Sequence, residues 1–242
     1  MSFSDLLDRF PSLSAVVAGD LMLDQYIFGR ATRISPEAPV MVVRQTATKS
    51  VPGGAANVAR NVRALGARAH VAGLIGDDDA GRLLAKMLSF DSQASLTVDP
   101  ARTTTTKTRV LADHAHQVLR IDHEVSDPPS PAVEEELLGQ TRRAMQRADV
   151  LILSDYLKGA LPGSLIRALI EDAKARGIPV VANPKPGSLA SYQGSTLVSL
   201  NRGEAANALG EADLETDRAI EAASSLRRES GAESLIITLG ED

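Results

Sequence analysis

The sequence predicts an α/β fold: a doubly wound, mostly parallel sheet with helices on both faces, and a small β-sheet that stands off it. Short, continuously apolar segments of strand length alternate with amphipathic segments of helix length along the chain. Two other segments have strand-like patterns and no helix of their own. With 242 residues, the chain is long enough for one sizeable core, and we expect a single domain over residues 1–242.

The predicted strands of the main sheet are apolar on both faces, which is typical of a parallel sheet covered by helices on each side. They are residues 15–18, 69–75, 150–153, 178–181, 196–199 and 234–239. The predicted helices are residues 3–10, 55–65, 79–89, 131–147, 163–176, 203–209 and 215–230. In the segment 55–65, for example, Val58, Val62 and Leu65 fall on one helical face.

The small sheet is predicted from about residues 34–51 and 104–122, and the second segment reads as a hairpin that turns near Asp113 and His114. We interpret this sheet as a lid over a cleft, because both segments flank the motifs described below. The alternative is an edge hairpin without a function. Apolar residues such as Met41, Val43 and Val110 would be exposed to solvent on an isolated sheet. We therefore expect the lid to bury them against a second subunit in a homodimer.

Composition excludes several classes of protein. The net charge of −5 disfavours a nucleic-acid partner, because binding to phosphates needs clustered Lys and Arg. The chain has no cysteine, which rules out disulfides and thiolate metal sites and fits a reducing compartment. No apolar run is long enough to span a bilayer, and the first residues lack the pattern of a signal peptide. We therefore expect a cytoplasmic protein with no membrane partner.

Polar residues follow the predicted strands at the point where each strand ends. In an open parallel sheet, ligands bind in the crevice beyond these carboxyl ends. The residues found there are Asp20, Asp24, Ser154, Asp155, Asn183, Lys185, Asn201 and Glu204. Any one of them could simply be a turn residue or a helix cap, but their shared position favours a binding site.

A glycine pair, Gly53-Gly54, precedes the helix that begins near residue 55. Glycines at a helix start let a ligand approach backbone N–H groups that have no partner within the helix. Asn57 lies in the first helical turn, where its amide can both donate to and accept from a sugar hydroxyl. We expect Asp20 and Asn57 to point into one cleft and to bind sugar. Alternatively, Asp20 caps a turn and Asn57 caps its helix.

Basic residues occur on or beside the two lid segments. They are Arg33, Lys107, Arg109 and Arg120. On a lid they could meet an anionic substrate, and the alternative is that they belong to a solvated strand face.

These motifs together resemble the ribokinase-like, or PfkB-type, carbohydrate kinases. The resemblance covers essentially the whole chain and rests on Gly19-Asp20, Gly53-Gly54 with Asn57, the segment 73–77 (GLIGD), and Asn201 to Glu204 (NRGE). It implies a ribokinase-like fold and an enzyme that transfers a phosphoryl group from ATP, with Mg²⁺, to a small-molecule sugar.

Longer segments resemble the heptose-7-phosphate kinases of this family. They are residues 33–40 (RISPEAPV), 106–109 (TKTR), 119–122 (LRID), 154–156 (SDY) and 158–159 (KG). This resemblance implies transfer of the ATP γ-phosphoryl to the anomeric hydroxyl of D-glycero-D-manno-heptose 7-phosphate, a precursor of lipopolysaccharide heptose.

The resemblance also implies roles for individual residues. Asp20, Gly53, Gly54, Asn57 and Asp155 would bind the sugar. Arg33, Lys107, Arg109 and Arg120 would meet its phosphate. Lys185, Asn201 and Glu204 would face the nucleotide phosphates, with Glu204 near Mg²⁺ through water.

Two features depart from the pattern of the heptose kinases. Asn183-Pro184-Lys185 stands where they carry Asp-Pro-Lys, which leaves open a kinase for another sugar. The chain also reaches Asp242 before the family's Gly-Ala-Gly-Asp motif, which holds the catalytic base and much of the ATP site. We therefore expect no catalytic residue within these 242 residues and negligible activity from them, and a non-catalytic sugar-phosphate-binding protein is a further alternative.

Overall fold

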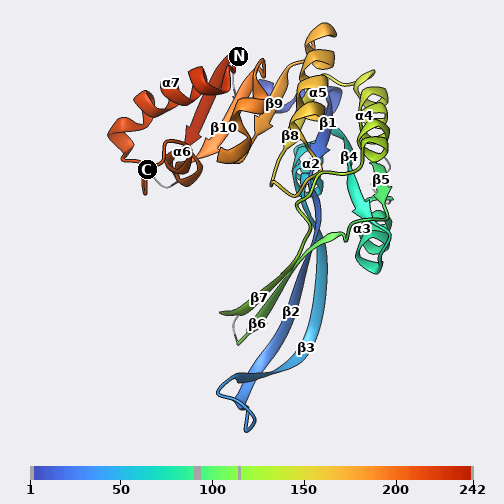
Figure 1. Cartoon of the computed structure of the whole chain (residues 1–242), viewed down its shortest axis with the longest axis vertical. Coiled ribbons are helices and arrows are strands. Elements are labelled where there is room, and N and C mark those ends of the chain that lie inside the picture. The colour runs from blue at the N-terminus through green and yellow to red at the C-terminus, as the bar shows by residue number, and fades with distance from the viewer. Residues whose placement is uncertain (1–2, 90–93, 114–115, 241–242) are drawn as a thin grey trace.

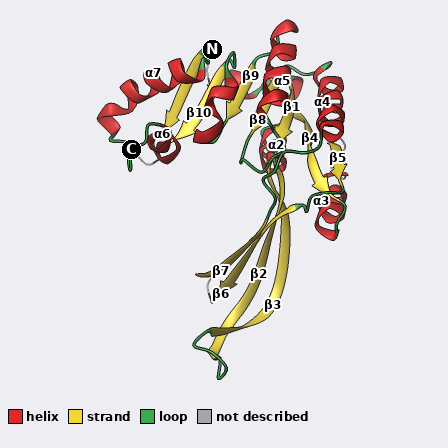
Figure 2. Cartoon of the chain, in the orientation of Figure 1, coloured by secondary structure: helices red, strands yellow, loops and turns green. Residues whose placement is uncertain are grey.

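The computed structural model describes residues 3–89, 94–113 and 116–240. Within them, seven strands form one sheet in the order β11-β10-β9-β8-β1-β4-β5, and every neighbouring pair is parallel (Figures 1 and 2). The strands are β1 (Ser14–Gly19), β4 (Arg68–Gly76), β5 (Ala94–Asp99), β8 (Val150–Ser154), β9 (Val180–Asn183), β10 (Leu197–Asn201) and β11 (Ser234–Thr238).

Helices cover both faces of this sheet, as predicted. Along β1, Val16 and Ala18 belong to an apolar cluster with helices α4 and α5, whereas Val17 belongs to a second cluster with α2 and α3. A strand that is buried on both faces in this way needs apolar residues at every position. The helices are α1 (Phe3–Leu7), α2 (Ala55–Ala64), α3 (Asp79–Ser89), α4 (Pro131–Met145), α5 (Gly163–Ala175), α6 (Arg202–Ala208) and α7 (Ala219–Ser230), with short 3₁₀ turns at Phe10–Ser12, Pro186–Tyr192 and Thr216–Arg218.

A second sheet projects away from the first and forms the long arm in Figure 1. Its order is β3-β2-β6-β7, from β2 (Leu21–Ile34), β3 (Met41–Gly54), β6 (Thr105–Ala112) and β7 (His116–His123). The two predicted lid segments thus lie in one small sheet. The predicted hairpin joins β6 to β7 and bends at Asp113, whose φ is 37°, while His114 lies outside the described residues.

Two strands are missing from the sequence-based prediction. Strand β2 lies in the middle of the arm and pairs with β3 on one side and with β6 on the other. Only Leu21, Met22 and Leu23 at its root are fully buried; the rest are half-buried or exposed and several are charged, so the apolar pattern of a strand is weak there. Strand β5 is the edge strand of the main sheet and pairs only with β4 among the described residues. An edge strand needs fewer apolar positions, which explains why it was missed.

The arm is rooted at the carboxyl end of β1. Strand β2 begins at Leu21, two residues after β1 ends, and β3 ends at Gly54, directly before α2. Gly54 has a φ of +59°, and a Cβ there would lie 2.2 Å from the carbonyl oxygen of Asp20. Only glycine permits this close approach, so Gly54 fixes the root of the arm at the crevice.

Candidate functional site

The predicted crevice lies at the carboxyl edge of the main sheet. Gly19 at the end of β1 pairs with Ser154 at the end of β8, and Ser154 pairs with Asn183 at the end of β9. Asn201 ends the next strand, β10. The strand ends identified from sequence therefore lie along one edge, and the arm starts from the same edge.

Asp20 does not face this crevice as an open ligand. Its carboxylate accepts the backbone N–H groups of Tyr156, Lys158 and Ala160 at 2.6, 3.1 and 3.0 Å, and the residue is 1% exposed. Burial raises the pKa of Asp20, although the three amide hydrogen bonds lower it in part. The turn-capping alternative describes Asp20 better than the predicted sugar contact, because both oxygens are already used within the protein.

Asp24 takes the position that was expected of Asp20. It lies on β2, opposite Val51 of β3 and beside Lys107 of β6. A Cβ at Gly53 would lie 2.2 Å from its Oδ2 atom, so the carboxylate stands directly against the glycine pair. Its Oδ1 atom accepts a hydrogen bond from Arg109 at 2.5 Å. Strand β2 was not predicted, and this hid the role of Asp24. When residues 21–34 form a strand that pairs with residues 41–54, the alternation of side chains between the two faces of the sheet places Asp24 over Gly53.

Asn57 is exposed in the first turn of α2 and its side chain has no hydrogen-bond partner among the described residues. Helix α2 has Gly54 at its N-cap and no side-chain cap, so Asn57 is not the cap that was considered as an alternative. The N–H of Ala55 donates to the carbonyl of Asp20 at 2.9 Å, so the helix start offers only its following N–H groups, together with the side-chain amide of Asn57, to a polar ligand.

Three of the four predicted phosphate-binding residues gather on one face of the arm, each paired with a carboxylate. Lys107 lies 3.0 Å from Asp122, Arg120 lies 2.9 Å from Asp122, and Arg109 pairs with Asp24. The guanidinium of Arg109 also lies over the ring of Tyr26 at 5.4 Å.

Arg33 is not part of this group. It is exposed near the far end of β2, where it pairs with Val42, nine residues along the strand from Asp24. At the rise of an extended strand, this separates the two residues by roughly 30 Å. Within this chain, Arg33 therefore does not join the sugar site, contrary to the prediction.

The predicted nucleotide-side residues do come together. Lys185 forms an ion pair with Glu204 and lies 5.0 Å from the centre of the Tyr156 ring. Asn201 and Glu204 form a capping box at the start of α6: Asn201 Oδ1 accepts the N–H of Glu204 at 2.8 Å, and Glu204 Oε2 accepts the N–H of Asn201 at 2.9 Å. The cap thus holds the carboxylate of Glu204 beside the ammonium group of Lys185.

Asp155 is buried and has an internal role. Its carboxylate accepts hydrogen bonds from the N–H of Leu157, the hydroxyl of Ser188 and the hydroxyl of Tyr192, at 2.8, 2.6 and 3.0 Å, and the residue is 2% exposed. Burial, together with the nearby charge of Asp155, raises the pKa of Tyr192 well above its ordinary value. The geometry gives Asp155 a role in tying the loop after β8 to the Pro186–Tyr192 turn, rather than the predicted direct contact with substrate.

The motif and fold evidence agrees with a comparison to known families. The model of a family described as pfkB family carbohydrate kinase matches residues 13–242. The chain belongs to the pfkB family. The resemblance drawn from its motifs is therefore confirmed at the level of the family.

Curated relatives of this pfkB-family chain include two proteins named "Bifunctional protein HldE". The protein from Caulobacter vibrioides is 44% identical over 235 residues, which are 96% of this chain and 48% of that protein. The protein from Azorhizobium caulinodans is 46% identical over 213 residues, which are 86% of this chain and 44% of that protein. The chain thus spans about half the length of the curated relatives it matches.

Solved structures support the fold. Phosphofructokinase-2 from Escherichia coli in complex with fructose-6-phosphate matches with a TM-score of 0.71 and 20% identity, over 94% of this chain and 74% of that chain. A carbohydrate kinase from Agrobacterium tumefaciens matches with a TM-score of 0.64 and 19% identity, over 94% and 70%. At these identities the likeness shows the fold alone, and it confirms the ribokinase-like architecture.

The site of this pfkB-family chain has two chemically different halves. One half offers the carboxylate of Asp24 and the amide of Asn57, which suit hydroxyl groups, and the cations of Lys107 and Arg109, which suit a phosphate. The other half offers Lys185 beside Glu204. Among the described residues no group of three or more His, Asp or Glu side chains could by itself hold a metal ion. Glu204 is a single carboxylate, and Mg²⁺ is commonly bound by one or two carboxylates together with water and phosphate oxygens, so this residue fits such an ion.

No helix within the described ranges is both long and apolar enough to cross a membrane.

Proposed function

We propose that this chain supplies the sugar site and part of the nucleotide site of an ATP-dependent kinase, and that the kinase phosphorylates D-glycero-D-manno-heptose 7-phosphate at its anomeric hydroxyl. The observation that carries the proposal is the position of Asp24 and Asn57 at the Gly53-Gly54 turn, beside the cations of the arm. The resemblance of residues 33–40 and 106–109 to heptose-7-phosphate kinases, and the 44–46% identity to proteins named HldE, support this choice of sugar.

The sugar half needs acceptors and donors that are fixed before the substrate arrives. Asp24 can accept from hydroxyls through its two oxygens, and Asn57 can both accept and donate. Backbone N–H groups at the start of α2 add donors on the same side. We assign these groups to the sugar ring, and we assign to Asp20 and Asp155 the task of holding the loop at residues 155–160.

The phosphate half uses the cations of β6 and β7. Lys107, Arg109 and Arg120 lie on one face of the arm and can neutralise a phosphate, with the planar guanidinium of Arg109 suited to two-point contact. An arm that covers the bound sugar would also exclude water, which could otherwise accept the phosphoryl group. This is the lid role expected from the sequence.

The nucleotide half would hold ATP and Mg²⁺ near Lys185, Asn201 and Glu204. When bound, Mg²⁺ supplies charge neutralisation for the transferring phosphoryl group. Lys185 would bind a phosphate oxygen, and Glu204 would orient the water ligands of the metal while it holds Lys185 in place.

The proposal is tested by calorimetric titration of heptose 7-phosphate into the wild-type chain and two variants of α2, Asn57→Ala and Asn61→Ala. Both asparagines are exposed on the same helix, one turn apart. We expect Asn57→Ala to weaken binding by about tenfold, because an unpaired site group costs roughly 1–3 kcal/mol, and Asn61→Ala to leave it unchanged. Equal affinities for all three proteins would contradict the proposed site. Tighter binding of fructose 6-phosphate than of heptose 7-phosphate would contradict the proposed substrate and favour a kinase for another sugar.

We also propose that the arm pairs with a second copy of the chain. Leu119 and Ile121 on β7 are about half exposed, as is Met41 on β3. They lie on a thin sheet that has no helix packed over it in Figure 1. A sheet of this kind is expected to bury its apolar residues against a partner. Analytical ultracentrifugation should therefore show a dimer that Ile121→Lys weakens, and a monomer at all concentrations would refute this part of the proposal.

A further inference from the structure

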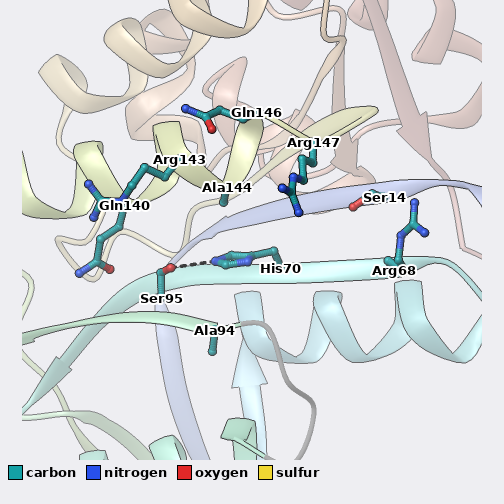
Figure 3. A pocket seen from close by; sticks show the side chains of 10 residues that line it. All are labelled: Ser14, Arg68, His70, Ala94, Ser95, Gln140, Arg143, Ala144, Gln146 and Arg147. Atoms are coloured by element: carbon teal, nitrogen blue, oxygen red, sulfur yellow. Dashed lines mark hydrogen bonds between the residues drawn. The ribbon is translucent and has the colours of Figure 1, made fainter.

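A second hollow lies at the opposite edge of the main sheet from the crevice. Its volume is about 730 Å³, which falls within the usual range of small-molecule sites. Figure 3 shows its lining: Ser14, Arg68 and Ser95 come from the first residues of β1, β4 and β5, and α4 with the segment after it closes the other side. Strand β1 is six residues long, so this hollow lies roughly 20 Å from the sugar site.

We call this hollow the arginine groove and define it by Arg68, His70, Ser95, Gln140, Arg143 and Arg147. Three of these residues are arginines, which line the hollow from two sides: Arg143 and Arg147 from α4 and the segment after it, and Arg68 from β4 (Figure 3). No acidic side chain is among the lining residues that the structure describes. Within the described ranges, Arg143 and Arg147 have no ion-pair partner, and Arg68 donates only to the carbonyl of Ser12, at 3.3 Å.

The neighbouring residue Arg142 provides a contrast. It lies on the same turn of α4 but pairs with Asp172 of α5 at 2.5 Å. Two acids bond to residues of the hollow: Asp149 accepts the N–H of Ser14, and Glu136 accepts from the amide of Gln140. Within the described ranges, Arg143 and Arg147 thus lack the kind of carboxylate partner that Arg142 has.

The uncharged part of the arginine groove carries hydrogen-bonding groups. Nε2 of His70 and the hydroxyl of Ser95 are 2.8 Å apart. Burial lowers the pKa of His70, so the imidazole is neutral at pH 7 and the positive charge comes from the arginines. Gln140 lines the groove and donates its NH₂ to Glu136. The hydroxyl of Ser95 can accept from a ligand hydroxyl while it bonds to His70, because a hydroxyl has two acceptor lone pairs and one donor.

We propose that the arginine groove binds a small phosphorylated polyol or sugar, with its phosphate on guanidinium groups of the groove and its hydroxyls on the side of Ser95. Guanidinium groups match phosphate oxygens in geometry and charge, and the hydroxyl of Ser95 matches those of the polyol. This site is separate from the crevice and does not depend on the function proposed above.

A simpler explanation accounts for only part of the observations. Arg143 lies in the last turn of α4, where a cation is favoured by the helix dipole. That effect does not explain the hollow or the presence of Arg68 from β4 in its lining. Helix α7 offers the matched comparison, because its last turn carries Arg227 and Arg228 and neither of them lines the arginine groove.

The test titrates the 242-residue chain with glucose 6-phosphate, with glucose and with inorganic phosphate, and every protein carries Asp24→Asn to weaken the crevice. Calorimetry measures affinity, and ¹H–¹⁵N spectra locate the ligand. The amides of Arg68 and Ser95 should shift, and that of Gly53 should not. We expect the double variant Arg143→Gln/Arg147→Gln to lose at least about tenfold in affinity for glucose 6-phosphate, because hydrogen bonds between charged groups are lost.

The control variant Arg227→Gln/Arg228→Gln should keep its affinity within about twofold. Equal losses in both double variants would overturn the proposal, because they would indicate nonspecific attraction of the anion. Absence of shifts at Arg68 and Ser95 would overturn it independently, on a chain whose arginine groove is intact. Inorganic phosphate that binds as tightly as glucose 6-phosphate would overturn the polyol part.

Discussion

Replacing Asp20 by alanine removes a carboxylate that three backbone N–H groups of the loop after β8 share. Hydrogen bonds to a charged group are each worth about 1.5–3 kcal/mol, but the cost of burying the carboxylate offsets part of this sum. The pKa of Asp20 is raised because the effect of its burial outweighs that of its three hydrogen bonds. Asp20→Ala leaves three N–H groups without their acceptor, each at a cost of about 1–3 kcal/mol, and with this offset we expect the free energy of unfolding to fall by about 3–5 kcal/mol.

Urea unfolding followed by circular dichroism measures this loss. A decrease of about 3–5 kcal/mol is a large part of a typical stability of roughly 5–15 kcal/mol, so the urea midpoint should fall clearly. Asp8→Ala is the control, because Asp8 is exposed near the start of the chain and should change stability by less than about 0.5 kcal/mol.

The result that would refute this reasoning is an Asp20→Ala protein with unchanged stability and no affinity for sugar phosphate. That outcome would restore Asp20 as a direct ligand, as expected from the sequence. Lowered stability with sugar affinity retained at low urea would confirm its structural role and leave the sugar contact to Asp24.

Three further predictions concern the arm, the nucleotide half and the pH dependence of stability. Arg109→Gln should weaken binding of heptose 7-phosphate about tenfold or more, because a charged partner of the phosphate is lost. Binding of unphosphorylated heptose should be unchanged or stronger, because Asp24 is released from its ion pair. Equal losses for both ligands in calorimetry would contradict this prediction. Tyr156→Leu removes the ring beside Lys185 and should weaken ATP binding about two- to fivefold, since an exposed cation–π contact is worth roughly 0.5–1 kcal/mol. Tyr156→Phe keeps the ring and should leave ATP binding unchanged. Identical nucleotide titrations for the two variants would refute this prediction. Burial alone would raise the pKa of Asp78, but hydrogen bonds from Thr104 and Gly81 hold it below its ordinary value of 3.8. The carboxylate therefore stabilises the fold above pH 3.8, and this contribution is lost as the pH falls through the lower folded-state pKa. The difference in urea midpoint between wild type and Asp78→Asn should shrink from pH 7 to pH 3, and a constant difference would contradict this prediction.

The main sheet could be predicted because its strands are short, apolar on both faces and separated by amphipathic helices. Strands β2 and β5 could not be predicted in this way, for related reasons. Only a few residues at the root of β2 are fully buried, and β5 is an edge strand, so neither needs the continuous apolar pattern on which the prediction depended.

The site could be predicted as a region but not in every residue. The strand-end rule placed Asp20, Asp155 and Asn201 correctly at one edge of the sheet. It could not tell which carboxylates point outward, because that depends on the loop after β8, whose backbone N–H groups turn toward Asp20. Asp24 was not predicted as a sugar ligand because its role depends on the register of the hairpin formed by β2 and β3, which pairs Asp24 with Val51, and β2 itself was not predicted.

The face of the arm that carries the predicted phosphate ligands is already neutralised by its own carboxylates. Arg109 pairs with Asp24, and Lys107 and Arg120 pair with Asp122, with side chains that are partly open to solvent. Partly exposed pairs of this kind are worth only about 0–1 kcal/mol, so a phosphate can displace them at little cost. If the proposed function holds, a substrate phosphate that binds Arg109 breaks its ion pair with Asp24. The carboxylate of Asp24 is then free to accept from the sugar hydroxyls. A sugar without a phosphate must displace Arg109 with hydroxyls alone, and the site would therefore select phosphorylated sugars by an exchange of ion pairs as well as by direct contact.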